Sequence, residues 1–192
     1  MYQDTNDYDI ALCNQALLQM GGKRITDFDD SSVEARDCNT FYPFVRDQVL
    51  EAFPWRFAKK RATLKMSSIT PAFGYSYAFN LPADCLRPLS IDYDAGDEPN
   101  WEREGTVILT DEEEVNLHYI ARVDSSRFSP SFIRAASLLL ASRLAMSVGK
   151  DKKLAAELED KYIRFIEQDA MVLNARSSNP PIKTPTGYVE AR

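Results

Sequence analysis

Apolar residues recur at helical spacing in two stretches near the N-terminus. Through 10–20 they fall at i, i+3, i+7 and i+10, and the glycine pair at 21–22 follows as a helix stop. A second stripe runs through 38–53 and ends before Pro54. Pro43 lies inside that stripe, so the sequence predicts either a kinked helix or a break into two helices.

The start of the second helix leaves two candidates for the N-cap. Ser31 and Glu34 have the spacing of a capping box, whereas Ser32 lies directly before the first predicted helical residue. Either hydroxyl can accept a hydrogen bond from the first turn, so the pattern predicts a helix start here without choosing the cap.

Two further helices are predicted in the C-terminal half. In "FSPSFIRAASLLLASRLAMSVGK", Ser129 suits the N-cap and Pro130 the first helical position. This helix is apolar nearly all round, so we expect it at the centre of a helical bundle. Gly149 ends it, and an amphipathic pattern then runs from Asp151 to about Asn174. The short connection predicts antiparallel neighbours.

Four short apolar stretches between these helical halves predict strands: "YAFNL", "LRPLSIDY", "TVILT" and "VNLHYIARV". Turn residues separate them, and we expect the last two to form a hairpin across "DEEE". The predicted fold class is mainly α with a β insert, a four-helix bundle with a small antiparallel β subdomain and an extended C-terminal tail. The bundle comprises 1–65 and 125–176, the β-rich insert 66–124, and the C-terminal arm 177–192.

Composition adds limits on the class of protein. The 192 residues, 44% hydrophobic and 27% charged, suit a compact domain that needs no disulfide or metal to fold. The net charge of -6 argues against a general nucleic-acid binder. Cys13, Cys38 and Cys85 form no CxxC pair, so we expect reduced, buried thiols. With no secretion signal and no stretch long enough to span a bilayer, a soluble intracellular protein without membrane contact is expected.

Charge is distributed unevenly along the chain. The segment "EAFPWRFAKKRATL" contains a basic face with no acid among its members, namely Arg56, Lys59, Lys60 and Arg61. It is followed by an acidic face made of Asp97, Glu98, Glu102, Glu104, Asp111, Glu112, Glu113 and Glu114. Trp55 and Phe57 are interleaved with the basic residues, as in a nucleic-acid patch. Aromatic residues after a helix-ending proline more often close a core, so we favour a structural corner whose basic face contacts a neighbouring subunit or another protein partner.

The sequence gives no catalytic, metal-binding or cofactor-binding set, so no enzyme activity and no cofactor are predicted. His118 is the only histidine and has no partner at ligand spacing, which favours a structural role. The acids of "DEEE" read as a solvated turn, because a calcium loop would need alternating acids and a glycine. A hydrolase that uses Glu112 or Glu114 is a weak alternative.

Two stretches resemble a known family. "YPFVRDQVLEAFPWRFAKKRATL" (42–64) and "YAFNLPADCLRPLSI" (77–91) resemble the tail tubular protein A family, the head-to-tail adaptor or gatekeeper proteins of short-tailed bacteriophages. The opening "ALCNQALLQMGGKRITDFDDSSVEAR" (11–36) is similar to their first helix, glycine stop and second helix start. The likeness covers the first half of the chain, and the later helix pair is consistent in order and length.

The resemblance implies a structural protein of the virion, assembled in the host cytoplasm. It implies a homo-oligomeric ring of 12 subunits that docks under the portal protein, receives the tail nozzle protein and lets DNA pass through its channel without specific binding. It also implies that the C-terminal segment reaches the portal, through residues such as Pro180, Pro181, Ile182, Lys183, Pro185, Tyr188 and Val189. The alternative function is a nucleic-acid-binding module that uses the basic stretch 56–65.

Overall fold

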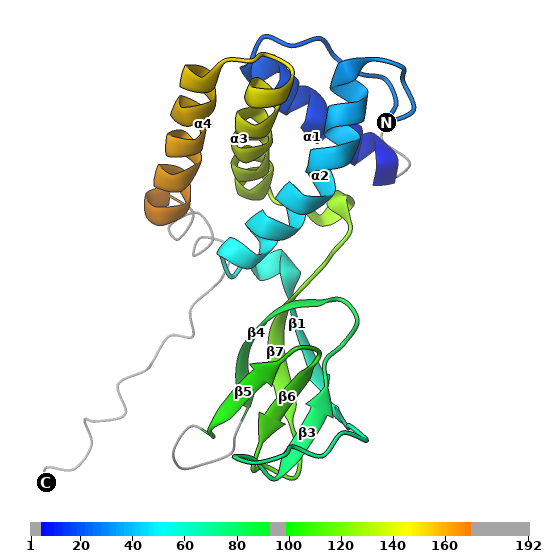
Figure 1. Ribbon diagram of the computed structural model, residues 1–192, viewed down its shortest axis with the longest axis vertical. Coiled ribbons are helices and arrows are strands. Elements are labelled where there is room, and N and C mark those ends of the chain that lie inside the picture. The colour runs from blue at the N-terminus through cyan, green and yellow to red at the C-terminus, as the bar shows by residue number, and fades with distance from the viewer. Residues whose placement is uncertain (1–4, 93–98, 170–192) are drawn as a thin grey trace, which may run out of the picture.

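The computed structural model describes residues 5–92 and 99–169. Its described part consists of a helical domain and a β domain joined by a narrow waist, the segments 53–58 and 122–128 (Figure 1). The helical domain contains α1 (Thr5–Gln19), α2 (Val33–Ala52), α3 (Pro130–Ser147) and α4 (Lys152–Arg164), and α4 continues into a π-helical turn, η3 (Phe165–Asp169). At the waist lie two short 3-10 turns, η1 (Arg56–Ala58) and η2 (Ser125–Arg127).

The helix ends follow from local chemistry. Ser32, rather than Ser31, is the N-cap of α2, and its hydroxyl accepts a hydrogen bond from the Ala35 N–H at 3.2 Å. Ser129 caps α3 in the same way, as predicted. The carboxylate of Asp151 accepts from two backbone N–H groups at the start of α4, each at 3.0 Å. Gly21, just past α1, has a φ of 73°, which few residues other than glycine adopt.

Helix α3 packs against α1, α2 and α4, as its apolar surface predicts. Phe132, Leu139, Leu140 and Leu144 on α3 are almost fully buried. Helix α2 runs without interruption through Pro43, so the alternative of a break into two helices is wrong. Within the described residues, no helix combines the length and apolar character needed to cross a membrane.

The β domain is formed by two antiparallel sheets. The three-stranded sheet has the order β1-β7-β4, and the four-stranded sheet has the order β2-β3-β6-β5. The strands found among the described residues are β1 (Lys59–Thr63), β2 (Lys65–Met66), β3 (Tyr77–Asn80), β4 (Cys85–Asp92), β5 (Trp101–Glu104), β6 (Val107–Thr110) and β7 (Asn116–Ala121). Gly105, with a φ of 56°, allows the tight turn between β5 and β6.

The predicted fold class, a four-helix bundle with a small β insert, is therefore wrong. The four helices share a mixed fold with seven described strands in two sheets, and the first strand begins at Lys59, within the segment assigned to the bundle. The strands missing from the prediction are β1, β2 and β5, whose residues are all exposed or half-buried. Such strands have no buried face and therefore show no alternation of apolar and polar residues in the sequence. They are held in place by backbone pairing to β7, β3 and β6.

The predicted hairpin across "DEEE" is also wrong. β6 pairs with β3 and β5, whereas β7 pairs with β1 and β4, so the turn carries the chain from one sheet to the other. The crossing places Ile108 of β6 and Leu117 of β7 in facing layers, where both are fully buried. Burial between two sheets is more extensive than a lone two-stranded hairpin can provide, which explains the arrangement.

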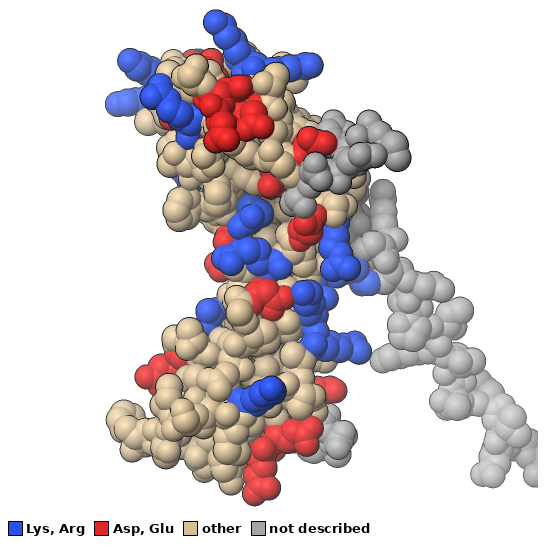
Figure 2. Space-filling view, turned by 90° about the vertical axis from the view of Figure 1, so that its right-hand side faces the viewer, with Lys and Arg blue, Asp and Glu red and all other residues tan. Residues whose placement is uncertain are grey.

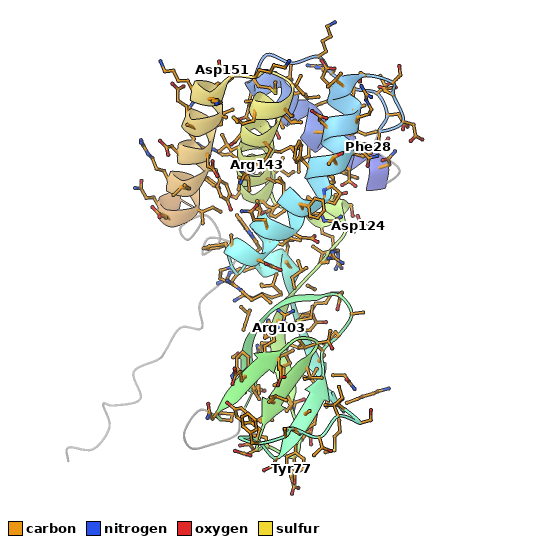
Figure 3. All side chains as sticks on the ribbon, in the orientation of Figure 1. Phe28, Tyr77, Arg103, Asp124, Arg143 and Asp151 are labelled. Carbon is orange, nitrogen blue, oxygen red and sulfur yellow. The ribbon has the colours of Figure 1, made fainter. Side chains whose placement is uncertain are left out.

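One hydrophobic core runs through both domains. Phe79 and Ile108 of the four-stranded sheet and Ile91 and Leu117 of the three-stranded sheet belong to it, so the two sheets pack face to face. The same core continues through Trp55 at the waist into the helical domain. Arg103 adds a polar link between the sheets, because its guanidinium donates to the Leu86 carbonyl at 2.8 Å (Figure 3).

Candidate functional site

The aromatic residues that accompany the basic segment form a closed corner at the waist. Trp55 is 1% exposed, and its indole N–H donates to the Val49 carbonyl at 2.7 Å. The rings of Phe53, Phe57 and Phe132 surround the indole, with centroids 5.0, 6.1 and 5.5 Å away. Trp55 therefore has no free face on which a nucleic-acid base could stack.

The basic residues lie next to this corner, on two different secondary-structure elements. Arg56 lies in η1, whereas Lys59, Lys60 and Arg61 lie on β1 at one edge of the three-stranded sheet. Side chains alternate along a strand, so Lys59 and Arg61 share one side of that sheet. Arg61 lies opposite His118 of β7, and His118 in turn lies opposite Ser90 of β4.

This row of residues lines a hollow on the sheet. The basic hollow, as we call it, has a volume of about 590 Å³ and is lined by Lys59, Lys60, Arg61, Leu89, Ser90 and His118. A smaller depression of about 230 Å³ continues it past Arg61 and His118 to Asp92 and Asn116. Figure 2 shows lysine and arginine side chains gathered around and just below the waist, and acidic side chains toward the lower end of the β domain.

Lys60 is held by an ion pair that joins the two stretches on which the family resemblance is based. Its ammonium lies 2.7 Å from a carboxylate oxygen of Asp84, in "LPADCLR", and the Tyr119 hydroxyl donates to the same carboxylate at 3.2 Å. Burial opposes ionisation of Asp84, but Lys60 and Tyr119 outweigh it and lower the pKa of Asp84. Burial and the charge of Asp84 raise the pKa of Tyr119 to about 12.

Lys59 and Arg61 differ from Lys60 in this respect. Both are exposed, and neither forms an ion pair or a side-chain hydrogen bond with any residue that the structure describes. The hollow therefore presents two uncompensated positive charges beside the Ser90 hydroxyl and the His118 imidazole. Such a surface favours a ligand that carries negative charge.

The predicted acidic face separates into a strip and a turn. Glu102 and Glu104 are exposed on β5 and lie opposite Leu109 and Val107 of β6. Leu109 and Val107 form a small cluster separate from the shared core, so all four side chains lie on the outer face of the four-stranded sheet. Ile108, between them in sequence, faces the shared core.

The acids of "DEEE" lie in the exposed turn between β6 and β7. The Asp111 carboxylate accepts from the backbone N–H and the hydroxyl of Ser76, each at 2.8 Å, and the Glu114 carboxylate accepts from the Asn116 side-chain amide at 3.4 Å. The Tyr77 hydroxyl, at the lower end of the molecule, lies 3.5 Å from Glu113 (Figure 3). All four acids of this turn are exposed, as predicted for a solvated turn: Asp111, Glu112, Glu113 and Glu114. Asp97 and Glu98 lie outside the described residues.

Sequence reasoning missed several members of the hollow. His118 was assigned only a structural role, yet it is half-buried and lines the hollow beside Arg61. Ser90 and Leu89 were not selected, because no motif marks them. Strand alternation could place Ser90 on a polar face, but only the observed register places it opposite His118.

The remaining sequence predictions concern cysteines, metals and the C-terminal arm. Cys13 and Cys38 are buried free thiols, whereas Cys85 is only half-buried, so the expectation of burial is wrong for Cys85. The described residues contain no group of three or more His, Cys, Asp or Glu side chains placed to hold a metal ion. The portal-binding residues predicted in 180–189 lie outside the described residues.

The family resemblance remains a prediction. Neither a protein-family model nor a curated protein matches the chain.

Proposed function

We propose that this protein is a head-to-tail connector of a bacteriophage virion, a ring-forming subunit that docks under the portal and receives the tail nozzle. The observation that carries the proposal is the presence of large, exposed apolar side chains on both domains of an elongated molecule. Phe44 on α2 is 75% exposed, and Phe73 in the loop between β2 and β3 is 88% exposed. That loop lies at the lower end of the molecule (Figure 1).

Exposed phenylalanines of this kind favour contacts with other proteins. Phe73 does not stand alone, because Met66 and Ile69 of the same segment are also among the exposed large apolar residues. Clustered apolar side chains on a surface are typical of interaction sites, whereas single ones are common. Exposed apolar side chains on both domains suit a subunit that joins one partner to another.

The proposal is tested by mixing the purified full chain with portal rings of a short-tailed phage and measuring particle mass by mass photometry. We expect a ring of subunits on each portal, followed by binding of the nozzle protein. Portals that stay bare in the presence of excess chain would contradict the proposal. A chain that is monomeric in isolation would not, because rings of this class can require the portal as a template.

A variant lacking residues 177–192 provides a second arm of the test. The resemblance implies that this segment reaches the portal, so its deletion should leave the unfolding midpoint unchanged and weaken portal attachment. Attachment at the affinity of the full chain would remove the C-terminal arm from the proposal while leaving the connector role intact.

The two uncompensated cations of the basic hollow favour nucleic-acid binding as a second candidate function. That candidate predicts DNA binding whose logarithmic salt dependence becomes shallower in the Lys59→Gln, Arg61→Gln variant, because fewer counterions are released. Titrations of DNA with the protein that show no binding at low salt would contradict this second function. Burial of Trp55 leaves such binding without its expected aromatic platform.

A further inference from the structure

We propose that the basic hollow of one copy of this chain receives the acidic strip of a second copy, in a head-to-tail contact between their β domains. The acidic strip is Glu102 and Glu104 on β5. In the proposed ring, this contact would join each subunit to its neighbour. The contact between two copies does not rest on the proposed function, whereas the closure of such contacts into a ring does.

The two surfaces lie on opposite sides of the β domain. Arg61 and His118 lie on the outer face of the three-stranded sheet, because Leu117, next to His118, faces the four-stranded sheet. Lys59 is on the same side as Arg61, at the waist end of β1, where it is itself exposed but lies opposite the buried Ile120. Glu102 and Glu104 lie on the outer face of the four-stranded sheet. Two sheets packed face to face turn their outer faces in opposite directions. One chain therefore cannot fill its own hollow with its own strip, whereas a second copy can.

The charges match in number and in spacing. Lys59 and Arg61 are separated by one residue along β1, as Glu102 and Glu104 are along β5. Residues at i and i+2 of a strand are about 7 Å apart on the same face. In the described part of the chain neither carboxylate has an ion-pair partner, as is true of both cations. A second copy can thus place two carboxylates against two cations at the same repeat.

Both surfaces are accessible, because the four charged side chains are exposed and β1 and β5 are edge strands of their sheets. An edge strand can recruit another strand, and charged side chains restrict which partner it accepts. Contact of β1 with β1 would oppose positive charges, and contact of β5 with β5 would oppose negative charges. Only the unlike pair is favourable, and a contact between two different surfaces of one chain is the heterologous kind from which rings are built.

A carboxylate strip explains the hollow better than a nucleic-acid backbone does. Asp92 lines the depression that continues the hollow, so an extended phosphodiester chain would pass a fixed negative charge. The chain also has a net charge of -6, which repels a long polyanion. A strip of two acidic residues can contact Lys59 and Arg61 without reaching Asp92.

Charge reversal tests the contact in the full chain. We expect Lys59→Glu, Arg61→Glu to weaken self-association in low salt at least about tenfold, because each reversed charge repels the neighbouring strip. Glu102→Lys, Glu104→Lys should weaken it equally. A one-to-one mixture of the two double variants should associate again, since the strip of each then complements the hollow of the other. Sedimentation velocity over a range of concentrations measures all four samples, and a natural chain that stays monomeric throughout and gives no cross-link between copies would overturn the inference.

Two matched controls separate this contact from general charge effects. Lys152→Glu, Lys153→Glu and Glu157→Lys, Asp160→Lys make the same changes of charge on exposed positions of α4. They should leave self-association as it is in the natural chain. Circular dichroism of every variant establishes that the fold is retained. Association that survives either reversal in β1 or β5, or a mixture that does not recover, would overturn the inference.

Zero-length carbodiimide cross-linking gives an independent measurement. In a mixture of ¹⁴N- and ¹⁵N-labelled chains, we expect mixed-isotope cross-links from Lys59 to Glu102 or Glu104. The reaction is carried out on the free chain and on portal-bound chain. Absence of these cross-links from both samples would also overturn the inference.

The outcomes distinguish this contact from the proposed function. If the chain binds portals and the reversals change nothing, the connector role stands and this contact fails. If the reversals and their mixture behave as expected but portals stay bare, the contact stands and the connector role fails. If Lys59→Glu, Arg61→Glu abolishes binding of a short DNA duplex while self-association persists, the hollow is a nucleic-acid site and the inference is overturned.

Discussion

Trp55 determines how the helical domain continues into the β domain. Its indole N–H donates to the carbonyl of Val49, which lies in the last turn of α2 where carbonyls lack partners within the helix. Its ring also contacts Phe132 of α3, so one side chain ties two helices to the start of β1. The residue that looked like part of a nucleic-acid patch in the sequence is thus a core residue.

Two substitutions of Trp55 should destabilise the fold to different extents. Trp55→Phe keeps most of the apolar volume but leaves the Val49 carbonyl without its donor, so we expect a loss of about 1–3 kcal/mol in the free energy of unfolding. Trp55→Ala also leaves a cavity, and the expected loss is about 3–5 kcal/mol. Urea unfolding measures both. Lys59→Ala, an exposed neighbour, should stay within about 0.5 kcal/mol of the natural chain, and equal losses for all three would contradict the assignment.

Asp47 provides a charged link at the same junction. Its carboxylate lies 2.7 Å from the guanidinium of Arg122, which follows β7, and 2.9 Å from that of Arg46. Burial opposes ionisation of Asp47, but the hydrogen bonds and charges of the two arginines outweigh it and lower its pKa below the usual range of an aspartate. The ion pair therefore joins α2 to the segment 122–128, the second of the two segments that form the waist.

This arrangement predicts a pH-dependent contribution to stability. A carboxyl whose pKa is lower in the folded than in the unfolded state stabilises the fold above its unfolded pKa of about 3.9, and the contribution disappears as the pH falls through the folded value. We expect Asp47→Asn to lower the free energy of unfolding by about 1 kcal/mol at pH 7, since the pair is partly exposed. The difference should shrink as the pH falls below the unfolded pKa and vanish once it has passed the lowered folded pKa, as urea unfolding over a pH series would show. A difference independent of pH would exclude the ionic origin.

At the scale of elements, the turn between β6 and β7 decides which sheet each strand joins. The turn is fixed to the loop between β2 and β3 by the two hydrogen bonds from Ser76 to Asp111. The other acids of this turn are exposed and do not share that contact. In "DEEE", Asp111 fixes the turn to that loop, Glu113 and Glu114 each accept one long hydrogen bond, from Tyr77 and Asn116, and the Glu112 side chain has none to a described residue.

Asp111 and Glu112 should differ when each is replaced by alanine. Asp111→Ala removes the acceptor for the Ser76 N–H and hydroxyl, so we expect a loss of about 1 kcal/mol in the free energy of unfolding and faster hydrogen exchange of the Ser76 amide. Glu112→Ala makes the same change of charge beside it and should be nearly neutral. Equal effects of the two substitutions would show that charge, rather than the hydrogen bonds, determines the stability of the turn.

At the scale of the molecule, the exposed phenylalanines allow the two domains to be tested separately. Phe44→Ala and Phe73→Ala alter side chains that are already in solvent, so each should change the free energy of unfolding by no more than about 0.5 kcal/mol. If the connector role holds, the two variants should fail at different steps, one in portal attachment and the other in recruitment of the nozzle protein. Mass photometry of the stepwise assembly measures this. Full assembly by both variants would exclude these residues as docking points.

Much of the helical domain could be predicted from the sequence because its signals are local. The caps at Ser129 and Asp151 and the glycine after α1 act within one turn of helix. The strands with apolar residues, β3, β4, β6 and β7, were predicted for the same reason. The basic and acidic segments were also recognised, although their partners in space were not.

The amino-acid sequence by itself determined where most helices and apolar strands begin and end, and where positive and negative charges lie along the chain. Only the tertiary structure decided the strand order, the pairing of the charged strands β1 and β5, and the meeting of Arg61, His118 and Ser90. Backbone hydrogen bonds between strands carry no side-chain signature, and register depends on which faces are buried together. For this reason the sequence identified "KKR" as basic, whereas the sheet made it one wall of a hollow that lies on the opposite side of the β domain from the acidic strip.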